Sequence, residues 1–251
     1  MKFESLATRL KSEKKEVTLL FRSIPGITLA LFALSLVGMN LLANKSIDFP
    51  LPYLALDAGI LFSWVSFLAM DVIVKHFGVK GANEVAILGT VLNLFMCLIF
   101  FIASFIPGAW SFSANDPSID IALDETFRGQ WFVILGSTVS FLVSSIVNNV
   151  LSWLLGKAFK KDNAVAFYVR SYVSTSIAQF LDNFIFALMV SIPFFSWSIP
   201  QALTCAALGM VAELLMEIFF SPIGYAISKK WKKDNVGKEY FDYRNSKGEN
   251  A

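Results

Sequence analysis

The stretch VAILGTVLNLFMCLIFFIASFIP, residues 85–107, contains 23 residues and no charged side chain. An α-helix needs about 20 apolar residues to cross a hydrocarbon core about 30 Å thick. This stretch is therefore long enough, and apolar enough, to predict a helix that spans a lipid bilayer.

Similar apolar runs recur along the chain, whose 251 residues are 56% hydrophobic and only 16% charged. A typical soluble domain has about 25% charged residues. We therefore predict an all-α, polytopic membrane protein with an even number of spans. Six apolar stretches predict its membrane-spanning helices, at residues 23–43, 52–74, 85–107, 131–156, 171–195 and 200–228.

Lysine and arginine are distributed unevenly between the two sides of the predicted bundle. All but two of the 21 basic residues fall on one side, which leaves Lys45 and Arg128 for the other. Loops rich in lysine and arginine stay cytoplasmic. We therefore predict cytoplasmic termini, with a basic segment at 1–22, a transmembrane domain at 23–228 and a polar tail at 229–251.

The basic N-terminal run is interpreted as a topology signal that meets anionic lipid headgroups, not as a nucleic-acid arm. Sequence motifs of catalysis and metal binding are absent. The chain has one histidine, His76, and two cysteines, Cys97 and Cys205, both inside apolar runs. It has no GxGD motif of intramembrane proteases and no GxxxxGK[ST] motif of ATPases. We expect no enzyme activity, no metal and no cofactor.

Several carboxylates nevertheless lie inside the predicted spans. Asp57 and Asp71 fall in the second span, Asp182 in the fifth, and Glu213 and Glu217 in the sixth. An ionised carboxylate near the centre of a spanning helix costs about 2.5–3.5 kcal/mol even on a lenient insertion scale. We therefore expect these side chains to face the bundle interior or a water-filled cavity.

Helical spacing supports this expectation in the segment RSYVSTSIAQFLDNFIF, residues 170–186. Gln179 and Asp182 share one helix face with the small residues that precede them at three- and four-residue steps. Glu213 and Glu217 are four residues apart and repel one another when both are ionised. One of the two is predicted to be protonated, or to pair with a cation such as Arg170 or with a substrate.

The other polar side chains in the spans leave alternatives open. Asn93 and Asn148 are interpreted either as hydrogen-bonding contacts between helices or as part of a binding site. Asp71 lies near the inner end of its span. It either forms a local cap or pair with neighbouring groups, or takes part in substrate binding. A binding role is favoured for Asp182 and Glu217, because a carboxylate is a costly contact between helices.

Five motifs follow the order and spacing of a known family: GMNLLANK (38–45), DVIVKHFG (71–78), LGTVLNLFM (88–96), residues 170–186 and ELLMEIFFSPIGY (213–225). Over residues 36–228 the chain resembles the putative vitamin uptake transporters. The best-understood members of that family import queuosine precursors. The resemblance implies import of 7-cyano- or 7-aminomethyl-7-deazaguanine across the inner membrane, for tRNA modification.

Such a cargo suits the polar side chains. A guanine-like ring offers N–H donors along one edge, which Asp182 or Glu217 can accept, and a carbonyl that an amide or arginine can satisfy. Its flat faces can stack on an aromatic ring such as that of Trp64. The expected substrate-binding residues are Asp182, Gln179, Glu217, Asn93, Asn148, Asp71, Arg170 and Trp64.

Two positions depart from the family pattern. Lys75 stands where the family usually has an acidic residue, and Glu213 where it usually has a basic one. Either the two form an ion pair exchanged intact, or the substrate differs. The expected partners are a small molecule, the lipid bilayer, and either further copies of the chain or energy-coupling subunits. The alternative functions are the substrate-binding subunit of an energy-coupling-factor transporter for another vitamin-like cargo, or a non-transporting scaffold.

Overall fold

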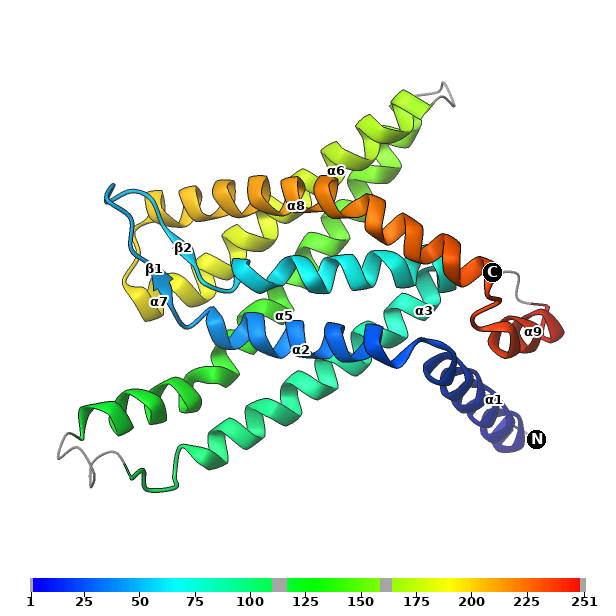
Figure 1. Ribbon diagram of the computed structural model, residues 1–251, viewed down its shortest axis with the longest axis horizontal. Coiled ribbons are helices and arrows are strands. Elements are labelled where there is room, and N and C mark those ends of the chain that lie inside the picture. The colour runs from blue at the N-terminus through cyan, green and yellow to red at the C-terminus, as the bar shows by residue number, and fades with distance from the viewer. Residues whose placement is uncertain (1, 110–116, 159–163, 249–251) are drawn as a thin grey trace. The chain divides into compact units, whose positions relative to one another are not determined.

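The computed structural model describes residues 2–109, 117–158 and 164–248 (Figure 1). Helices make up almost all of this part of the chain, which confirms the helical fold class. Its elements are α1 (Lys2–Ser23), α2 (Gly26–Leu42), β1 (Ser46–Ile47), β2 (Leu56–Asp57), α3 (Ile60–Ala103), α5 (Ser118–Ala158), α6 (Ala164–Phe186), the π-helix η1 (Ala187–Ser191), α7 (Ile192–Phe195), α8 (Ile199–Lys233) and α9 (Lys238–Ser246).

The chain divides into two compact units. The first consists of Met1–Leu36, Val65–Val91 and Glu217–Ala251, and the second of Val37–Trp64 and Leu92–Met216. Both α3 and α8 contribute to each unit, so sequence neighbours on these two helices can belong to different units.

An aromatic cluster forms the core of the first unit. Phe77 of α3 is completely buried, and its ring centre lies 5.7 to 6.0 Å from those of Trp231, Tyr240 and Phe241. Gly237, at a φ of 83°, turns the chain from α8 into α9 directly over this ring. A Cβ atom at position 237 would lie 2.6 Å from Phe77, so the close approach requires glycine.

A kink interrupts α3 inside the first unit. Gly78 has a φ of 77° and a ψ of 177°, which is non-helical and which residues with a Cβ rarely adopt. The sequence predicts a break between two spans at Gly78 and Gly81. The structure has a kink at Gly78, whereas Gly81 continues the helix; a separation into two spans at this point stays a prediction.

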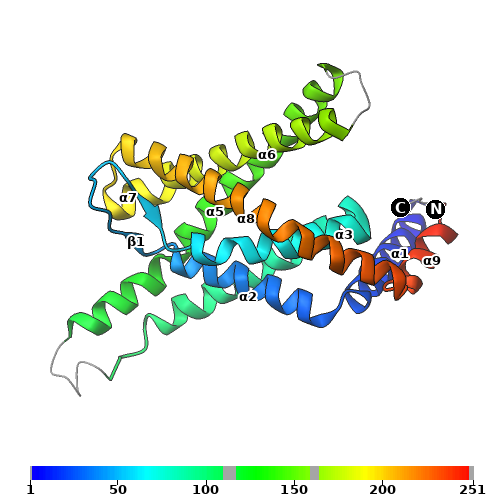
Figure 2. The same cartoon turned by 45° about the horizontal axis from the view of Figure 1, so that its top comes forward.

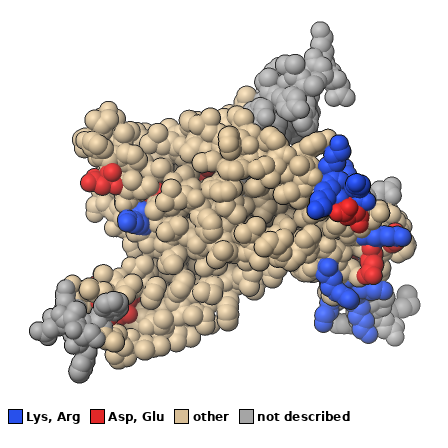
Figure 3. All heavy atoms as spheres, viewed as in Figure 1, with Lys and Arg blue, Asp and Glu red and all other residues tan. Residues whose placement is uncertain are grey.

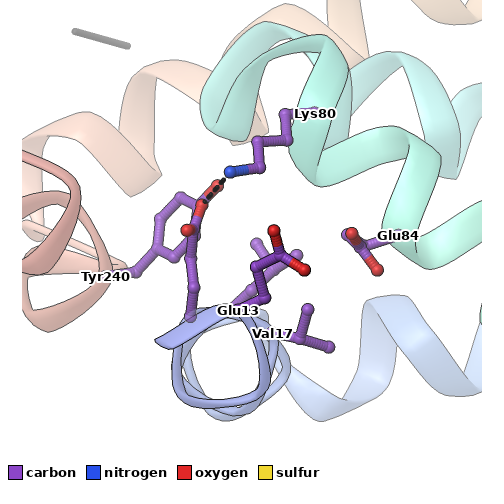
Figure 4. Close-up of a pocket in the computed structure, with 7 residues that line it drawn as sticks. Glu13, Val17, Lys80, Glu84 and Tyr240 are labelled. Carbon is purple, nitrogen blue, oxygen red and sulfur yellow. Dashed lines mark ion pairs between the residues drawn. The ribbon is translucent and has the colours of Figure 1, made fainter. Parts of the chain in front are cut away.

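One buried carboxylate joins the two ends of the chain in the first unit, where α1 and α9 lie side by side (Figures 1 and 2). Glu16 of α1 is 3% exposed and forms ion pairs with Lys80, at 2.7 Å, and with Lys247, at 2.9 Å. Figure 4 shows the cavity beside it, of about 280 Å³, into which Glu13 and Glu84 also point.

Exposed basic side chains gather over α1 and the end of α8, as Figure 3 shows. The last turns of α8 supply Lys229, Lys230, Lys232 and Lys233, all exposed. In the apolar C-terminal part of α3, by contrast, Leu94, Phe95 and Leu98 are each more than half exposed. Exposed apolar side chains of this kind suit a lipid environment.

Helices α5 and α6 run side by side in the second unit (Figures 1 and 2). Buried Val133 of α5 packs with Val190 of η1 and with Ala43, which follows α2. The hairpin of β1 and β2 pairs Ser46 with Asp57 in antiparallel register. Ala55 of this hairpin is buried with Trp197 and Cys205, so the hairpin packs on the first turns of α8.

The start of the second predicted span is wrong. The sequence predicts helix from residue 52, but α3 begins at Ile60, and Asp57 lies in β2 instead of inside a helix. Pro50 and Pro52 disfavour helix at their own positions and before them. The Asp57 carboxylate then accepts a 2.8 Å hydrogen bond from the Gly59 amide, which closes a local turn.

Three helical stretches in the described part of the chain are long and apolar enough to cross a membrane: Val72–Ala103, Val173–Phe195 and Ile199–Phe220. The pair Leu10–Ser23 and Gly26–Leu42, bent by 96°, makes a fourth candidate if it counts as one broken span. The protein is therefore a membrane protein with several candidate spans. The count of six and the cytoplasmic termini stay predictions.

Candidate functional site

Asp182 lies on the face of α6 that packs against α5. Its Oδ1 accepts a hydrogen bond from the hydroxyl of Ser144, 3.1 Å away, and Ser140 lies within hydrogen-bonding reach one turn earlier. Both serines are buried, at 6% and 1% exposed. Gly136, a further turn along α5, lets the helices approach here, because a Cβ atom at 136 would overlap Val190. The helix pair thus places the Asp182 carboxylate beside two buried hydroxyl groups.

Asn183, the next residue, faces α8 instead. Its amide nitrogen donates a 3.2 Å hydrogen bond to Oε2 of Glu213, which is only 7% exposed. The same nitrogen lies 3.0 Å from the backbone carbonyl of Gln179. Gly209 makes this contact possible, because a Cβ atom there would lie 2.9 Å from the Asn183 amide carbon. Two successive residues of α6 therefore contact different helices: Asp182 contacts α5, and Asn183 contacts Glu213 on α8.

Gln179 lies one turn before these two residues on α6. Its side-chain oxygen Oε1 is buried and has no hydrogen-bond partner among the described residues. A buried amide oxygen without a donor costs about 1–3 kcal/mol. The orphaned acceptor is what a cargo carrying N–H donors would satisfy.

A third carboxylate, Asp57, lies on the hairpin that packs on α8. Burial raises the pKa of Asp57 to about 6, against the opposing hydrogen bond from the Gly59 amide. Its charge also reaches Glu213 and Cys205. Three carboxyl groups on three different elements therefore interact electrostatically in the second unit.

The π-helix η1 begins four residues after Asn183. Each π-turn holds an extra residue, and such turns recur at functional sites because they change the facing of the side chains. The Ile192 amide bonds to the carbonyl of Ala187, five residues earlier. Pro193 follows at once and has no N–H to offer the helix, which is the one signal in the sequence for this irregularity.

The described residues contain no group of three histidine, cysteine or acidic side chains arranged to hold a metal ion. The side chains of Asp182, Asn183 and Glu213 can hydrogen-bond a ligand, and the two carboxylates can compensate a positive charge.

The structure brings together some of the residues predicted to bind substrate. Asp182 and Gln179 lie on α6 beside the polar contacts just described. Asn93, on α3, is buried at 7% exposed, but no hydrogen bond among the described residues joins it to the carboxylates. Trp64 donates its indole N–H to the Leu61 carbonyl at 3.1 Å, within its own helix.

Other predicted binding residues have side chains outside the described residues: Arg170, Asn148, Asp71 and Glu217. The backbones of Asp71 and Glu217 belong to the first unit, whereas Asp182 belongs to the second. The binding roles of these four residues stay predictions, as does the pairing of Lys75 with Glu213.

Sequence reasoning missed Ser140, Ser144 and Asn183 as parts of the site. The serines are four residues apart and therefore share one face of α5, a spacing that could have indicated them. Asn183 sits next to Asp182 in the sequence, but only the approach of α8 at Gly209 shows which group it contacts.

Comparison with known proteins gives one match. The sequence model of the Putative vitamin uptake transporter family matches residues 57–227, which is more than half of the chain and includes Asp57, Asp182 and Glu213. No curated protein and no solved structure matches. Helices α1, α2 and α9 lie outside the matched region. The chain belongs to the Putative vitamin uptake transporter family.

Proposed function

We propose that this protein imports a queuosine precursor, 7-cyano- or 7-aminomethyl-7-deazaguanine, across the inner membrane. Membership of a vitamin uptake transporter family supports the transport of a small molecule. The candidate spans support a place in the membrane. The choice of cargo rests on the chemistry of the polar side chains in the second unit.

The observation that carries the proposal is the combination on α6 of the Asp182 carboxylate and the orphaned Gln179 oxygen. The edge of a deazaguanine ring presents an N–H and an exocyclic amine side by side. A carboxylate accepts such a pair of donors with its two oxygens, and charge-assisted hydrogen bonds are about twice as strong as neutral ones. Gln179 would accept a further N–H.

The other predicted residues complete the proposal. Asn93 or Asn148 would hydrogen-bond the ring, Arg170 its carbonyl, and Trp64 would stack on its face. A site of this kind discriminates against cargo that lacks its N–H donors, because buried acceptors would then stay unpaired.

The test uses a bacterium that can neither make nor import queuosine precursors. Expression of this protein with nanomolar precursor in the medium should restore queuosine in tRNA. Asp182→Asn keeps the shape and the acceptor for Ser144 but loses the negative charge, and should abolish restoration. Glu239→Gln, at an exposed carboxylate of α9, is the matched control and should restore fully.

Both variants must be present in the membrane at the level of the unmodified protein. Absence of restoration by the unmodified protein would overturn the choice of cargo. Restoration by Asp182→Asn would remove Asp182 from the site.

A further inference from the structure

Among the side chains that the structure describes, the carboxylates of the candidate site accept hydrogen bonds from neutral groups. Among the residues whose side chains the structure describes, Asp182 contacts serine hydroxyls and Glu213 contacts an amide. Both lie within stretches apolar enough to span a membrane, Val173–Phe195 and Ile199–Phe220. Hydrogen bonds from neutral groups do not cancel a charge in hydrocarbon, which costs about 2.5–3.5 kcal/mol at a helix centre.

The hydroxyl groups of Ser140 and Ser144 stabilise the negative charge of Asp182 only in part. Each hydroxyl has one proton, and each lies in reach of a carbonyl of its own helix. Ser144 donates toward the Phe141 carbonyl at 3.0 Å, nearer than Asp182, and Ser140 donates toward the Ser137 carbonyl at 3.1 Å. The same protons cannot fully serve Asp182 as well.

Among the described side chains, the groups that face the two carboxyls from the packed elements are neutral or acidic. From α5 come Ser140 and Ser144, and from β2 comes Asp57, whose charge reaches Glu213. On α8, Cys205 lies within the electrostatic reach of both Asp57 and Glu213. The described surroundings therefore supply no positive charge to either carboxyl.

We propose that one positive charge crosses the membrane with each cargo molecule and compensates the carboxylates of Asp182 and Glu213. For an aminomethyl cargo the charge is the cargo's own ammonium. For a cyano cargo, which is neutral, it is a proton taken up by Glu213 on the outer side and released inside. This inference rests on the proposed function and specifies the coupling of the same site.

The test uses full-length protein in sealed proteoliposomes, with 7-cyano- and 7-aminomethyl-7-deazaguanine as separate probes. One charge moving through an inside-negative potential of about 100 mV is accumulated about 50-fold at equilibrium. Both probes should therefore accumulate about 50-fold. An outside-acid gradient should add about tenfold per pH unit for the cyano probe only, with acidification of the lumen.

Glu213→Gln keeps the acceptor for Asn183 but cannot carry a proton. It should bind the cyano probe and lose both its voltage-driven and its pH-driven accumulation. Glu239→Gln, exposed on α9, is the control and should behave as the unmodified protein.

Two failures are distinguishable. In the first, both probes bind, but uptake of the cyano probe depends on neither the membrane potential nor the pH gradient. This result overturns the charge proposal and leaves the proposed function standing. Absence of binding of either probe to folded protein overturns the proposed function, and this inference falls with it.

Discussion

Asn183 on α6 donates a hydrogen bond to Glu213 on α8, with 3.2 Å between Nδ2 and Oε2. The bond forms one turn after Gly209, where α8 has no side chain and its backbone approaches the Asn183 amide. The missing side chain at 209 and the amide–carboxylate pair are therefore one structural unit. A change at the glycine should act on the carboxylate without touching it.

Gly209→Ala is expected to lower both stability and uptake. The new Cβ would lie 2.9 Å from the Asn183 amide carbon, which is closer than real contacts allow. Overpacking of this kind costs about 1–3 kcal/mol, offset by at most about 1 kcal/mol from the better helix propensity of alanine. Thermal unfolding in detergent and cargo uptake measure the two effects.

Gly26→Ala is the matched control, because a Cβ atom at position 26 of α2 would meet nothing within 4 Å. It should be neutral or slightly stabilising. Equal behaviour of the two variants would show that α8 can move away from Asn183 at no cost.

Gln179→Met is expected to separate stability from function. Methionine has a similar size and removes the buried oxygen that has no partner among the described residues. Removal of the unsatisfied oxygen should leave the free energy of unfolding unchanged or raise it by up to about 1–3 kcal/mol. The melting temperature should accordingly stay the same or rise. Uptake should fall about tenfold or more, because the cargo loses an acceptor.

Gln201→Met provides the comparison. Gln201 accepts hydrogen bonds from Ser198 through Oε1 at the start of α8, so its replacement should lower stability slightly and leave uptake unchanged. A Gln179→Met protein that loses stability and keeps full uptake would mean that the oxygen serves the fold and not the cargo.

Much of the helical architecture could be predicted from the sequence, because apolar runs of spanning length are a local property of the chain. The kink at Gly78 could also be predicted, because glycine in a helical stretch is a local signal for a break. The hairpin around Asp57 and the π-helix after α6 could not. Both depend on contacts with α8 and on neighbouring prolines, which a count of apolar residues does not capture.

The candidate site could be predicted in part. Asp182 attracts notice because a carboxylate is costly inside an apolar helix. Its neighbours do not, since serine and asparagine are common in spans as contacts between helices. Which of them meets a carboxylate depends on the rotation of α5 and α8 about their axes, and this rotation is set by close approaches at Gly136 and Gly209.

Asp57 should make stability depend on pH. Burial raises its pKa from 3.8 to about 6, so the folded state binds its proton more tightly than the unfolded chain does. The contribution of Asp57 to stability is therefore fully present below about pH 4 and is lost as the pH rises through about 6. A shift of this size corresponds to at most about 3 kcal/mol.

Asp57→Asn keeps an oxygen for the Gly59 amide and cannot ionise. Its melting temperature relative to the unmodified protein should rise between about pH 4 and about pH 6 and then level off. Asp48→Asn, at an exposed carboxylate of the same hairpin connection, should show no such trend. Parallel pH profiles for Asp57→Asn and the unmodified protein would contradict the buried, proton-binding carboxyl.

Glu16→Gln should loosen α9 from α1. The carboxylate of Glu16 is 3% exposed and pairs with Lys80 and Lys247, so its loss removes charge-assisted contacts that connect the two ends of the chain. We expect about 1–3 kcal/mol of lost stability, because Lys80 is partly exposed and can return to water. Proteolysis of the C-terminal segment should become several-fold faster. Glu239→Gln, exposed on α9, should leave the rate unchanged. Equal rates in both variants would mean that the aromatic cluster around Phe77 alone holds α9 in place.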